Sequence, residues 1–361
     1  MEIYALDSDF NLKAIGIPYE NLQWTRKYYE AGDFQLRLPI KLYDPDWAYI
    51  GTTERPELGM IQKIEISGEG DVYALLSGFF CEKMLDDKVV YPKWKSSNTD
   101  ETSTGGVYII IGVENIARQL FKDRKKDLPI TLGKNNGFNK DRDETVLAVE
   151  DDPLGQSIYS FLETFEASYR VAYDYEQNRL TFEVWHGIDR TQSQSENSYQ
   201  VFSSDFGNIT GKTVNIDDSG YKNYAIIPVM DDGETVGKDV LYLDWSNGGY
   251  RKEIVLDKRS EWPDEYTTDA EFKKQVLQDA AEELAEYAIV EDIDIQVIDD
   301  TGYMTDYDLG DKCDVILSDI GMTMETRIVQ VDEVFKADGG HSVTVGLGNK
   351  RIDNIRRAVR K

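Results

Sequence analysis

The chain has 361 residues, a length that predicts two or three domains and a core large enough to need no disulfide framework. Its 40 Lys and Arg residues against 68 Asp and Glu residues give a net charge of −28, which argues against ordinary nucleic-acid binding. With 40% hydrophobic residues, no signal peptide and no membrane-length apolar run, the sequence indicates a soluble globular protein made in a reducing cytoplasm.

Residues 1–92 are expected to form a β-region without a helix. A period of two predicts strands at residues 2–6 and 33–38, and two further strands are expected at residues 60–66 and 72–76. The Gly and Asp residues of 67–71 predict a hairpin turn between the last two strands. A polar stretch at 95–106 is expected to be a surface loop or a domain junction.

Residues 93–204 combine helical and strand patterns and are expected to form an α+β domain. Apolar residues at helical spacing predict a helix over 113–121 and a second one after Asp152-Pro153, with Asp152 as N-cap and Pro153 as the first helical residue. Strand patterns at 169–175 and 179–185, separated by a short polar turn, predict a hairpin.

Residues 205–350 return to strand patterns with one inserted helix near 268–290, where Thr268 and Glu271 form a capping box. Strands are expected at residues 223–229, 240–244, 252–256, 292–298, 313–317, 327–331 and 342–346. The C-terminal tail, residues 351–361, is basic. It is either a frayed, solvated end or a tether to an acidic neighbour such as another copy of the chain.

The two β-regions share a weak internal likeness. Gly32-Asp33 opens a strand that is followed by a hairpin ending at Gly78, and Gly310-Asp311 opens a strand that is followed by a hairpin ending at Gly346. Because Gly-Asp before a strand is common, chance is one reading. The other is a duplication, in which two similar β-barrels enclose the α+β domain.

Residues for catalysis, cofactor binding or metal binding are expected to be absent. The only two histidines, His186 and His341, are expected in exposed loops, and Cys81 and Cys313 lie within strand patterns, where cysteine is a small buried apolar residue. No metalloprotease, dithiol or nucleophile-elbow motif occurs. The prediction is therefore a non-enzymatic protein with no catalytic, cofactor or metal site.

Two segments resemble binding loops but lack their defining features. Residues 207–213 resemble a phosphate loop, yet three residues separate the glycines in place of four, and a strand pattern follows where a helix is required. Residues 306–311 resemble a calcium loop without its bidentate Glu. The adjacent acid pairs are interpreted as turn and cap residues, because neighbours on a strand face opposite ways.

Aromatic residues leave a further alternative. Exposed Tyr and Trp side chains on a sheet can stack on sugars, whereas buried ones fill barrel interiors or subunit interfaces. Trp24, Tyr28 and Tyr29 fit either role, and Trp24 and Trp94 are the residues whose replacement would test sugar binding.

Six segments in order resemble a siphovirus tail protein family related to phage baseplate and tail-tip hubs and to the N-terminal part of tail-associated lysins. The likeness runs from about residue 20 to 348. The segments are 22–39, 182–191 with its Gly-x-Asp-Arg-Thr signature, 201–208, 250–254, 307–311 and the strand from Arg327 that ends near Gly348.

The resemblance implies an α+β, mainly β fold with two tube-type β-barrel domains and an α+β middle domain. It implies a homotrimeric hub at the tail tip of a virion, assembled in the bacterial cytoplasm, whose six barrels dock on a hexameric distal tail protein or tube ring. A tape-measure protein and a central fibre or lysin are further implied partners. DNA would pass through an acidic lumen without specific binding.

Longer relatives continue into a peptidase or fibre-like region, which this sequence does not show, so no peptidase activity is carried over. The signature residues are interpreted as structural: Asp189 and Arg190 would cap or pair at the end of the middle hairpin, and Gly310 and Asp311 would shape a turn. The alternatives to a structural hub are a cell-wall-degrading enzyme and a carbohydrate-binding tail-tip protein.

Overall fold

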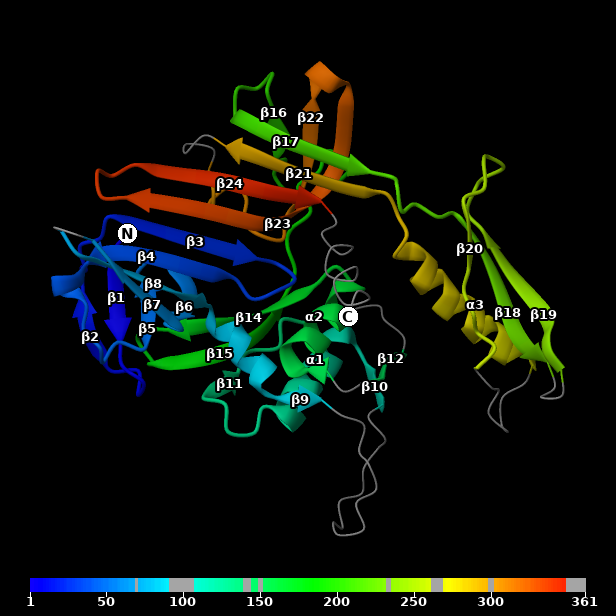
Figure 1. The fold of residues 1–361 in the computed structure, drawn as a ribbon, viewed down its shortest axis with the longest axis horizontal. Helices are drawn as coiled ribbons and strands as arrows, with labels where there is room; N and C mark the ends of the chain where they lie inside the picture. The colour runs from blue at the N-terminus through cyan, green and yellow to red at the C-terminus, as the bar shows by residue number, and fades with distance from the viewer. Residues whose placement is uncertain are drawn as a thin grey trace, which may run out of the picture. The chain divides into compact units, whose positions relative to one another are not determined.

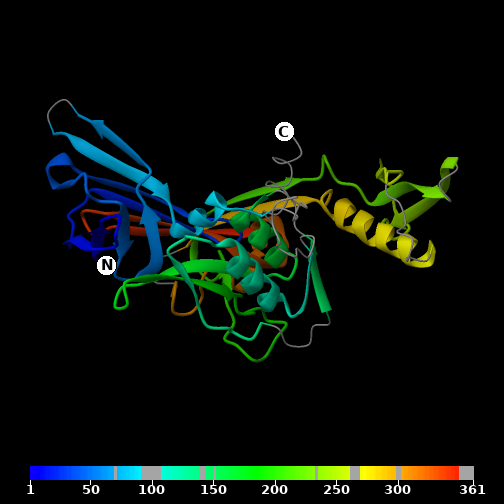
Figure 2. The same cartoon turned by 90° about the horizontal axis from the view of Figure 1, so that it is seen from below.

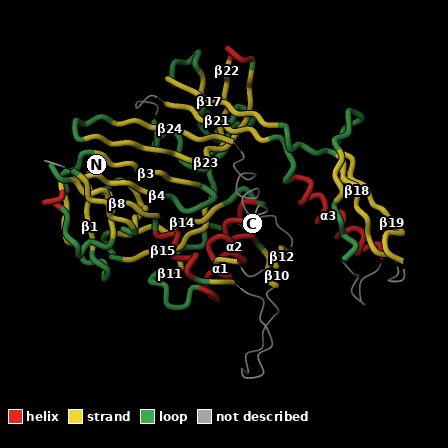
Figure 3. The backbone as a smooth tube through the Cα atoms, viewed as in Figure 1, coloured by secondary structure: helices red, strands yellow, loops and turns green. Residues whose placement is uncertain are grey.

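The computed structural model describes residues 1–68, 71–90, 107–138, 144–148, 152–231, 235–260, 269–297 and 302–348. The chain forms two compact units, of which the first contains Met1–Lys212 and Asp294–Leu347 and the second contains Thr213–Ile293. Strands predominate in both units, and most of them pair in antiparallel sheets (Figures 1 and 3). The predicted boundaries near residues 92 and 204 stay predictions.

The N-terminal β-region forms two sheets that share one core. Its elements are β1 (Ile3–Leu6), β2 (Leu12–Ile15), β3 (Asn21–Lys27), β4 (Asp33–Pro39), η1 (Ile40–Leu42), β5 (Tyr49–Thr52), β6 (Arg55–Met60), β7 (Lys63–Ser67), β8 (Tyr73–Phe79), η2 (Cys81–Asp87) and β9 (Val89–Val90). One sheet has the order β2-β1-β5-β6, and β3, β4, β8 and β7 belong to the longest sheet. In β4, Phe34, Leu36 and Leu38 are buried while the residues between them are exposed, as the alternation predicts.

The α+β part follows the first β-region within the first unit. Its elements are β10 (Val107–Ile111), α1 (Val113–Arg124), β11 (Ile130–Leu132), β12 (Glu144–Ala148), β13 (Asp152–Pro153), α2 (Leu154–Glu163), β14 (Ser168–Asp174) and β15 (Arg179–Trp185). Both helices bury an apolar stripe in a core that they share with the β14–β15 hairpin. The two predicted helices and the predicted hairpin are confirmed.

The C-terminal strands complete the longest sheet. They are β16 (Val201–Ser203), β17 (Ile209–Asp217), β21 (Val290–Val297), β22 (Lys312–Leu317), β23 (Met322–Lys336) and β24 (His341–Gly348), with a short 3-10 helix η3 (Ser318–Ile320). Along this sheet the order is β17-β21-β24-β23-β3-β4-β8-β7. Strands from the two ends of the chain are therefore hydrogen-bonded neighbours, and their arrows alternate in direction in Figure 1.

The second unit consists of a small sheet and one helix, and its elements lie between β17 and β21 in the sequence. It contains β18 (Tyr224–Asp231), β19 (Thr235–Asp244), β20 (Glu253–Val255) and α3 (Asp269–Ala285), with the strands in the order β19-β18-β20. The predicted inserted helix is confirmed, and its apolar residues Phe272, Val276 and Leu284 pack on one face of this sheet. Among the described residues, no helix is long and apolar enough to cross a membrane.

Two local predictions are wrong. Helix α2 begins at Leu154, one residue later than expected, because Asp152 and Pro153 pair with β9 as a short strand. The carboxylate of Asp86 then caps the helix by accepting the N–H of Gln156 at 3.1 Å. Cys81 is buried as expected, but it lies in the 3-10 helix η2 and not in a strand. The predicted loop at 95–106, the cap at Thr268 and the basic tail lie outside the described residues.

Candidate functional site

The candidate functional site is the joint at which strand β3 from the beginning of the chain pairs with strand β23 from its end. The two strands are antiparallel over seven residue pairs, from Gln330 opposite Lys27 to Lys336 opposite Asn21. This joint turns two separate β-regions into one sheet. It is a candidate site because residues from the two ends of the chain meet there in one hydrogen-bonded sheet.

A buried ion-pair network crosses the joint beside this pairing. Arg26 on β3 is 2% exposed, and it donates to Glu57 at 2.8 Å, to Asp308 at 2.6 Å and to the hydroxyl of Tyr303 at 2.8 Å. Burial disfavours the charge on Arg26, but the neighbouring carboxylates outweigh burial and raise its pKa above the ordinary value. The guanidinium is thus a permanent cation that holds both ends of the chain together.

A second ion pair lies on the same joint. Arg55 on β6 makes a bidentate pair with the fully buried Glu333 on β23, at 2.8 and 2.6 Å, and His341 contacts the same carboxylate at 3.1 Å. Burial alone would raise the pKa of Glu333, yet the bonds from Arg55 and His341 outweigh it and lower the pKa. His341 begins a strand and is half-buried, so its predicted place in an exposed loop is wrong.

Tyr28 connects the joint to the α+β part. Its ring is fully buried and its hydroxyl bonds to the carbonyl oxygen of Glu166 at 3.1 Å and the N–H of Gly187 at 3.3 Å. Its own N–H donates to Val329 on β23 at 2.9 Å. Burial raises the pKa of Tyr28 to about 12, so the phenol stays neutral and keeps its hydrogen on this network.

The signature segments of the sequence meet at this point. Arg190 pairs with Asp311 at 2.7 Å, while the carboxylate of Asp189 accepts the N–H of Thr191 at 3.0 Å and closes a turn. The expected structural roles are thus present, although Arg190 pairs across the chain and not with its neighbour. Gly310 adopts a φ of +87°, and a Cβ there would lie 2.4 Å from the ring of Tyr28.

The other residues that the sequence singled out lie either away from this joint or buried in the protein interior. His186 is exposed after β15, and both cysteines are free and buried. The segment that resembles a phosphate loop leads into strand β17, as expected, and not into a helix. Asp308 and Asp311 of the calcium-like loop bond to arginines. Within the described ranges, no group of three or more His, Cys, Asp or Glu side chains could hold a metal ion.

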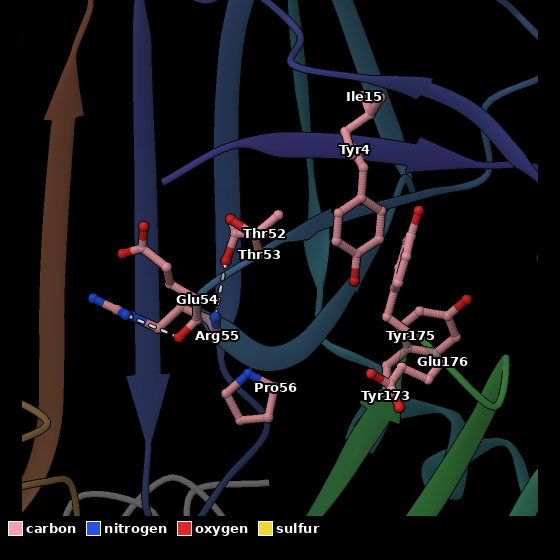
Figure 4. Close-up of a pocket in the computed structure, with 10 residues that line it drawn as sticks. All are labelled: Tyr4, Ile15, Thr52, Thr53, Glu54, Arg55, Pro56, Tyr173, Tyr175 and Glu176. Carbon is pink, nitrogen blue, oxygen red and sulfur yellow. Dashed lines mark hydrogen bonds between the residues drawn. The ribbon is translucent and has the colours of Figure 1, made fainter.

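A cavity of about 440 Å³ lies near the first β-strands (Figure 4). The ring of Tyr4 lies between the Thr52–Arg55 segment and Tyr175. The rings of Tyr4 and Tyr175 pack edge to face, with their centroids 5.2 Å apart. Two of the three charged groups on its wall are paired, Glu54 with the N-terminal amine at 2.7 Å and Arg55 with Glu333, and the third, Glu176, is exposed. The lining provides tyrosine surface and no pair of free acid and base groups.

Of the aromatic residues considered for sugar binding, Trp24 and Tyr28 are wholly buried. Trp24 packs against Phe34 and Phe80 in the core of the N-terminal sheets. Both residues therefore fill the interior, which is one of the two alternatives, and Trp24 is not available to stack on a sugar. Tyr29 is half-buried, and Trp94 lies outside the described residues.

The fold is that of phage tail proteins. The chain superposes over 97% of its length on 97% of the tail protein from Neisseria meningitidis MC58, with a TM-score of 0.59 at 12% sequence identity. The 43 kDa tail protein of prophage MuSo2 from Shewanella oneidensis gives 0.59 at 13% identity, over 96% of this chain and 98% of that one. Prophage tail protein gp18 from Listeria monocytogenes EGD-e gives a TM-score of 0.56 at 13% sequence identity, over 100% of this chain and 98% of that one.

A family model also matches the sequence. The model of the Siphovirus ReqiPepy6 Gp37-like protein covers residues 122–349, more than half of the chain. The chain therefore belongs to the Siphovirus ReqiPepy6 Gp37-like family, which confirms the resemblance to siphovirus tail proteins. Five of the six segments that carried the resemblance lie inside the match, and the segment at 22–39 lies outside it. No curated protein sequence matches the chain.

Proposed function

We propose that this chain is a structural hub of a phage or prophage tail tip, and that three copies form a ring which closes or continues the tail tube. The observation that carries the proposal is a repeated strand order in the longest sheet. The strands β3-β4-β8-β7 follow the order first, second, fourth, third along the chain, and β17-β21-β24-β23 follow the same order. Each set of four is one tube-type barrel unit in this proposal.

The joint between the two sets supplies the rule for building a ring. Within one chain, the third strand of the later set, β23, pairs with the first strand of the earlier set, β3. The same rule leaves two strands for joints between copies: β7 and β17 are at the two ends of the sheet order. A head-to-tail contact of this kind gives a closed ring when its rotation closes.

Strand β7 has the surface that such a joint requires. All five of its residues are exposed, including Ile64 at 42% and Ile66 at 61%. These isoleucines lie opposite Leu76 and Ala74 of β8, both fully buried, so the apolar face of the sheet continues onto β7 uncovered. Figure 2 shows the β7–β8 hairpin, in light blue, extending away from the rest of the first unit.

Three copies would present six sets of strands to a hexameric distal tail protein or tube ring. A trimer can match a hexamer when each subunit carries the docking unit twice. The net charge of −28 supports passage of DNA, because negative walls do not retain phosphates. In this proposal residues 1–92 and 205–350 provide the two barrels and 93–204 the middle domain, and the protein is a non-enzymatic virion component.

The test is the mass of the purified chain by light scattering on a sizing column, followed by negative-stain images of the same peak. We expect three times the subunit mass of 41.3 kDa and ring-shaped views, either alone or after mixing with the distal tail protein. Ile66→Asp should abolish the trimer, whereas Ile320→Asp, at a residue 53% exposed on η3, should not. A chain that stays monomeric and never assembles with tube components would rule the hub out.

The alternative of a wall-degrading enzyme has no supporting observation among the described residues. Its test is the release of peptides or reducing sugars from purified cell walls, and such release would replace the hub proposal. The alternative of carbohydrate binding is tested by mixing the full-length chain with purified polysaccharide of the host cell wall, and binding there would support it.

A further inference from the structure

We propose that Asn247 is a site of spontaneous covalent modification, where the side-chain amide is lost and an aspartate or an isoaspartate is formed. The sequence contains two Asn-Gly pairs, Asn136-Gly137 and Asn247-Gly248. Glycine after asparagine favours this reaction, because it has no Cβ that would hinder attack by its own backbone nitrogen. The folded chain protects the first pair and leaves the second one open, so the structure selects one site of the two.

The reaction needs only the chain and water. The backbone nitrogen of Gly248 attacks the side-chain carbon Cγ of Asn247, forms a C–N bond and gives up its proton. The bond between Cγ and Nδ2 breaks, and the amide nitrogen leaves as ammonia with that proton. Water then opens the resulting imide ring at one of its two carbonyl carbons. One opening gives an aspartate, and the other gives an isoaspartate, whose backbone is longer by one methylene. No oxidation or reduction takes place.

Asn247 and Gly248 are the two central residues of a tight turn. Both are exposed, with φ values of +50° and +80°, and the N–H of Gly249 donates to the carbonyl oxygen of Ser246 at 2.8 Å. This is a type I′ turn, in which Asn-Gly is a favoured pair. Among the described residues, neither the side chain of Asn247 nor the N–H of Gly248 has a hydrogen-bond partner, and a Cβ on Gly248 would meet nothing within 4 Å. The two reacting groups can therefore approach each other once the single bond of the turn opens.

The pair Asn136-Gly137 is equally exposed, but hydrogen bonds hold its reacting groups. The side-chain amide of Asn136 donates to the carbonyl oxygen of Val184 at 2.7 Å. The N–H of Gly137, whose nitrogen would attack, donates to Oδ1 of Asn135 at 2.8 Å. The fully buried Glu114 accepts the N–H of Asn136 at 2.8 Å. Attack at Asn136 requires these bonds to break first, so the folded chain slows the reaction there.

The modification is confined to the tip of the segment that joins β19 to β20. Asn223 fixes this segment on both sides of the turn: its carbonyl oxygen accepts the N–H of Trp245 at 2.9 Å, and its side chain donates to the carbonyl oxygen of Tyr250 at 3.0 Å. Neither bond involves the two residues that react. The reaction therefore adds one negative charge at the tip and, in the isoaspartate, lengthens the turn, while the strands on both sides stay paired.

The test is incubation of the purified full-length chain at mildly alkaline pH, followed over time by tryptic digestion and mass spectrometry. The tryptic peptide 239–251 contains Asn247, and the peptide 135–140 contains Asn136. We expect the first peptide to gain the mass difference between an OH and an NH2 group and to separate into two products. Its conversion should be about tenfold faster than that at Asn136, where additional hydrogen bonds must break. A digest at time zero corrects for conversion during preparation, and fragment ions identify the asparagine that reacts.

Two variants and one change of conditions separate the effect of the fold from that of the sequence. Asn247→Gln should abolish the conversion in peptide 239–251. Asn135→Ala frees the N–H of Gly137, so it should accelerate the reaction at Asn136 and leave that at Asn247 unchanged. Thermal unfolding checks that both variants fold. In urea, where the folded-state bonds are absent, the two pairs should convert at similar rates.

Three results would overturn the proposal: no conversion at Asn247, equal rates at the two pairs in the folded chain, or the same difference between them in the unfolded chain. None of these depends on whether the chain forms a ring.

Discussion

The clearest test of the interior of the first unit is the replacement Glu82→Gln. Glu82 lies in η2 and is buried against the α+β part, where its Oε1 accepts the N–H of Val171 at 3.2 Å. Its other oxygen has no hydrogen-bond partner among the described residues. Burial, followed by the nearby charge of Glu57, raises the pKa of Glu82 to about 7.

The direction of the effect follows from proton linkage. A carboxyl with a raised pKa binds its proton more tightly in the folded chain than in the unfolded one. The folded chain therefore loses stability as the pH rises from the ordinary pKa of 4.5 to the raised pKa of about 7, and the loss stays constant at higher pH. Between pH 5.5 and 7 this span is worth about 2 kcal/mol, at about 1.4 kcal/mol per pKa unit. Gln has the same shape without the charge, so the variant should lack this loss.

Urea unfolding at pH 5.5 and at pH 8 measures the difference. Both values lie above the isoelectric point of about 4.4, where the chain keeps a negative charge. The free energy of unfolding of Glu82→Gln minus that of the parent should be larger by about 2 kcal/mol at pH 8 than at pH 5.5, so the variant gains stability relative to the parent. Any fixed cost of the new amide cancels in this comparison. Glu176→Gln, at an exposed residue, is the control. Equal differences at both pH values would refute a buried, neutral Glu82.

Three further outcomes are expected. Arg26→Ala should lower the free energy of unfolding by about 3–5 kcal/mol in urea, because it leaves two carboxylates of the joint without their cation, and an unchanged midpoint would contradict this. Gly310→Ala should lower the free energy of unfolding by more than about 2 kcal/mol, because Gly310 has a positive φ and the new Cβ would clash with the ring of Tyr28. Gly207→Ala, also at positive φ but in open space, should cost clearly less, and equal costs would exclude the clash. Cys81 and Cys313 are buried with raised pKa values, so a thiol reagent should modify them only after unfolding, and rapid labelling of the native chain would contradict this.

Local periodicity predicted most elements because their causes lie within a few residues. The hairpin of β14 and β15 follows from alternation around a short turn, and helix α3 follows from a stripe of apolar residues at helical spacing. The start of α2 was misplaced for the opposite reason. Its first turn is decided by pairing of Asp152-Pro153 with β9 and by a cap from Asp86, and no local pattern contains either contact.

The joint could not be read from the sequence, since its partners are far apart along the chain. Arg26 and Asp308 are separated by 282 residues, and Arg55 and Glu333 by 278. A buried arginine carries no periodic signal, because it resembles a residue that faces water. One signal was available: the Gly-x-Asp-Arg-Thr segment and the Gly310-Asp311 segment both belong to the resemblance, and Arg190 pairs with Asp311.

The internal likeness was partly misaligned for a physical reason. The sequence pattern equated the hairpin β7–β8 with β23–β24, which the repeated strand order supports, and it equated β4 with β22. However, β4 pairs with β8, whereas β22 pairs with β23 and β16 and lies off the main order. By strand order the counterpart of β4 is β21. In the sequence, the residues of the second unit lie between β17 and β21. In the proposed duplication, the second unit is an insertion that lengthens the chain between β17 and β21 and leaves these two strands neighbours in the sheet.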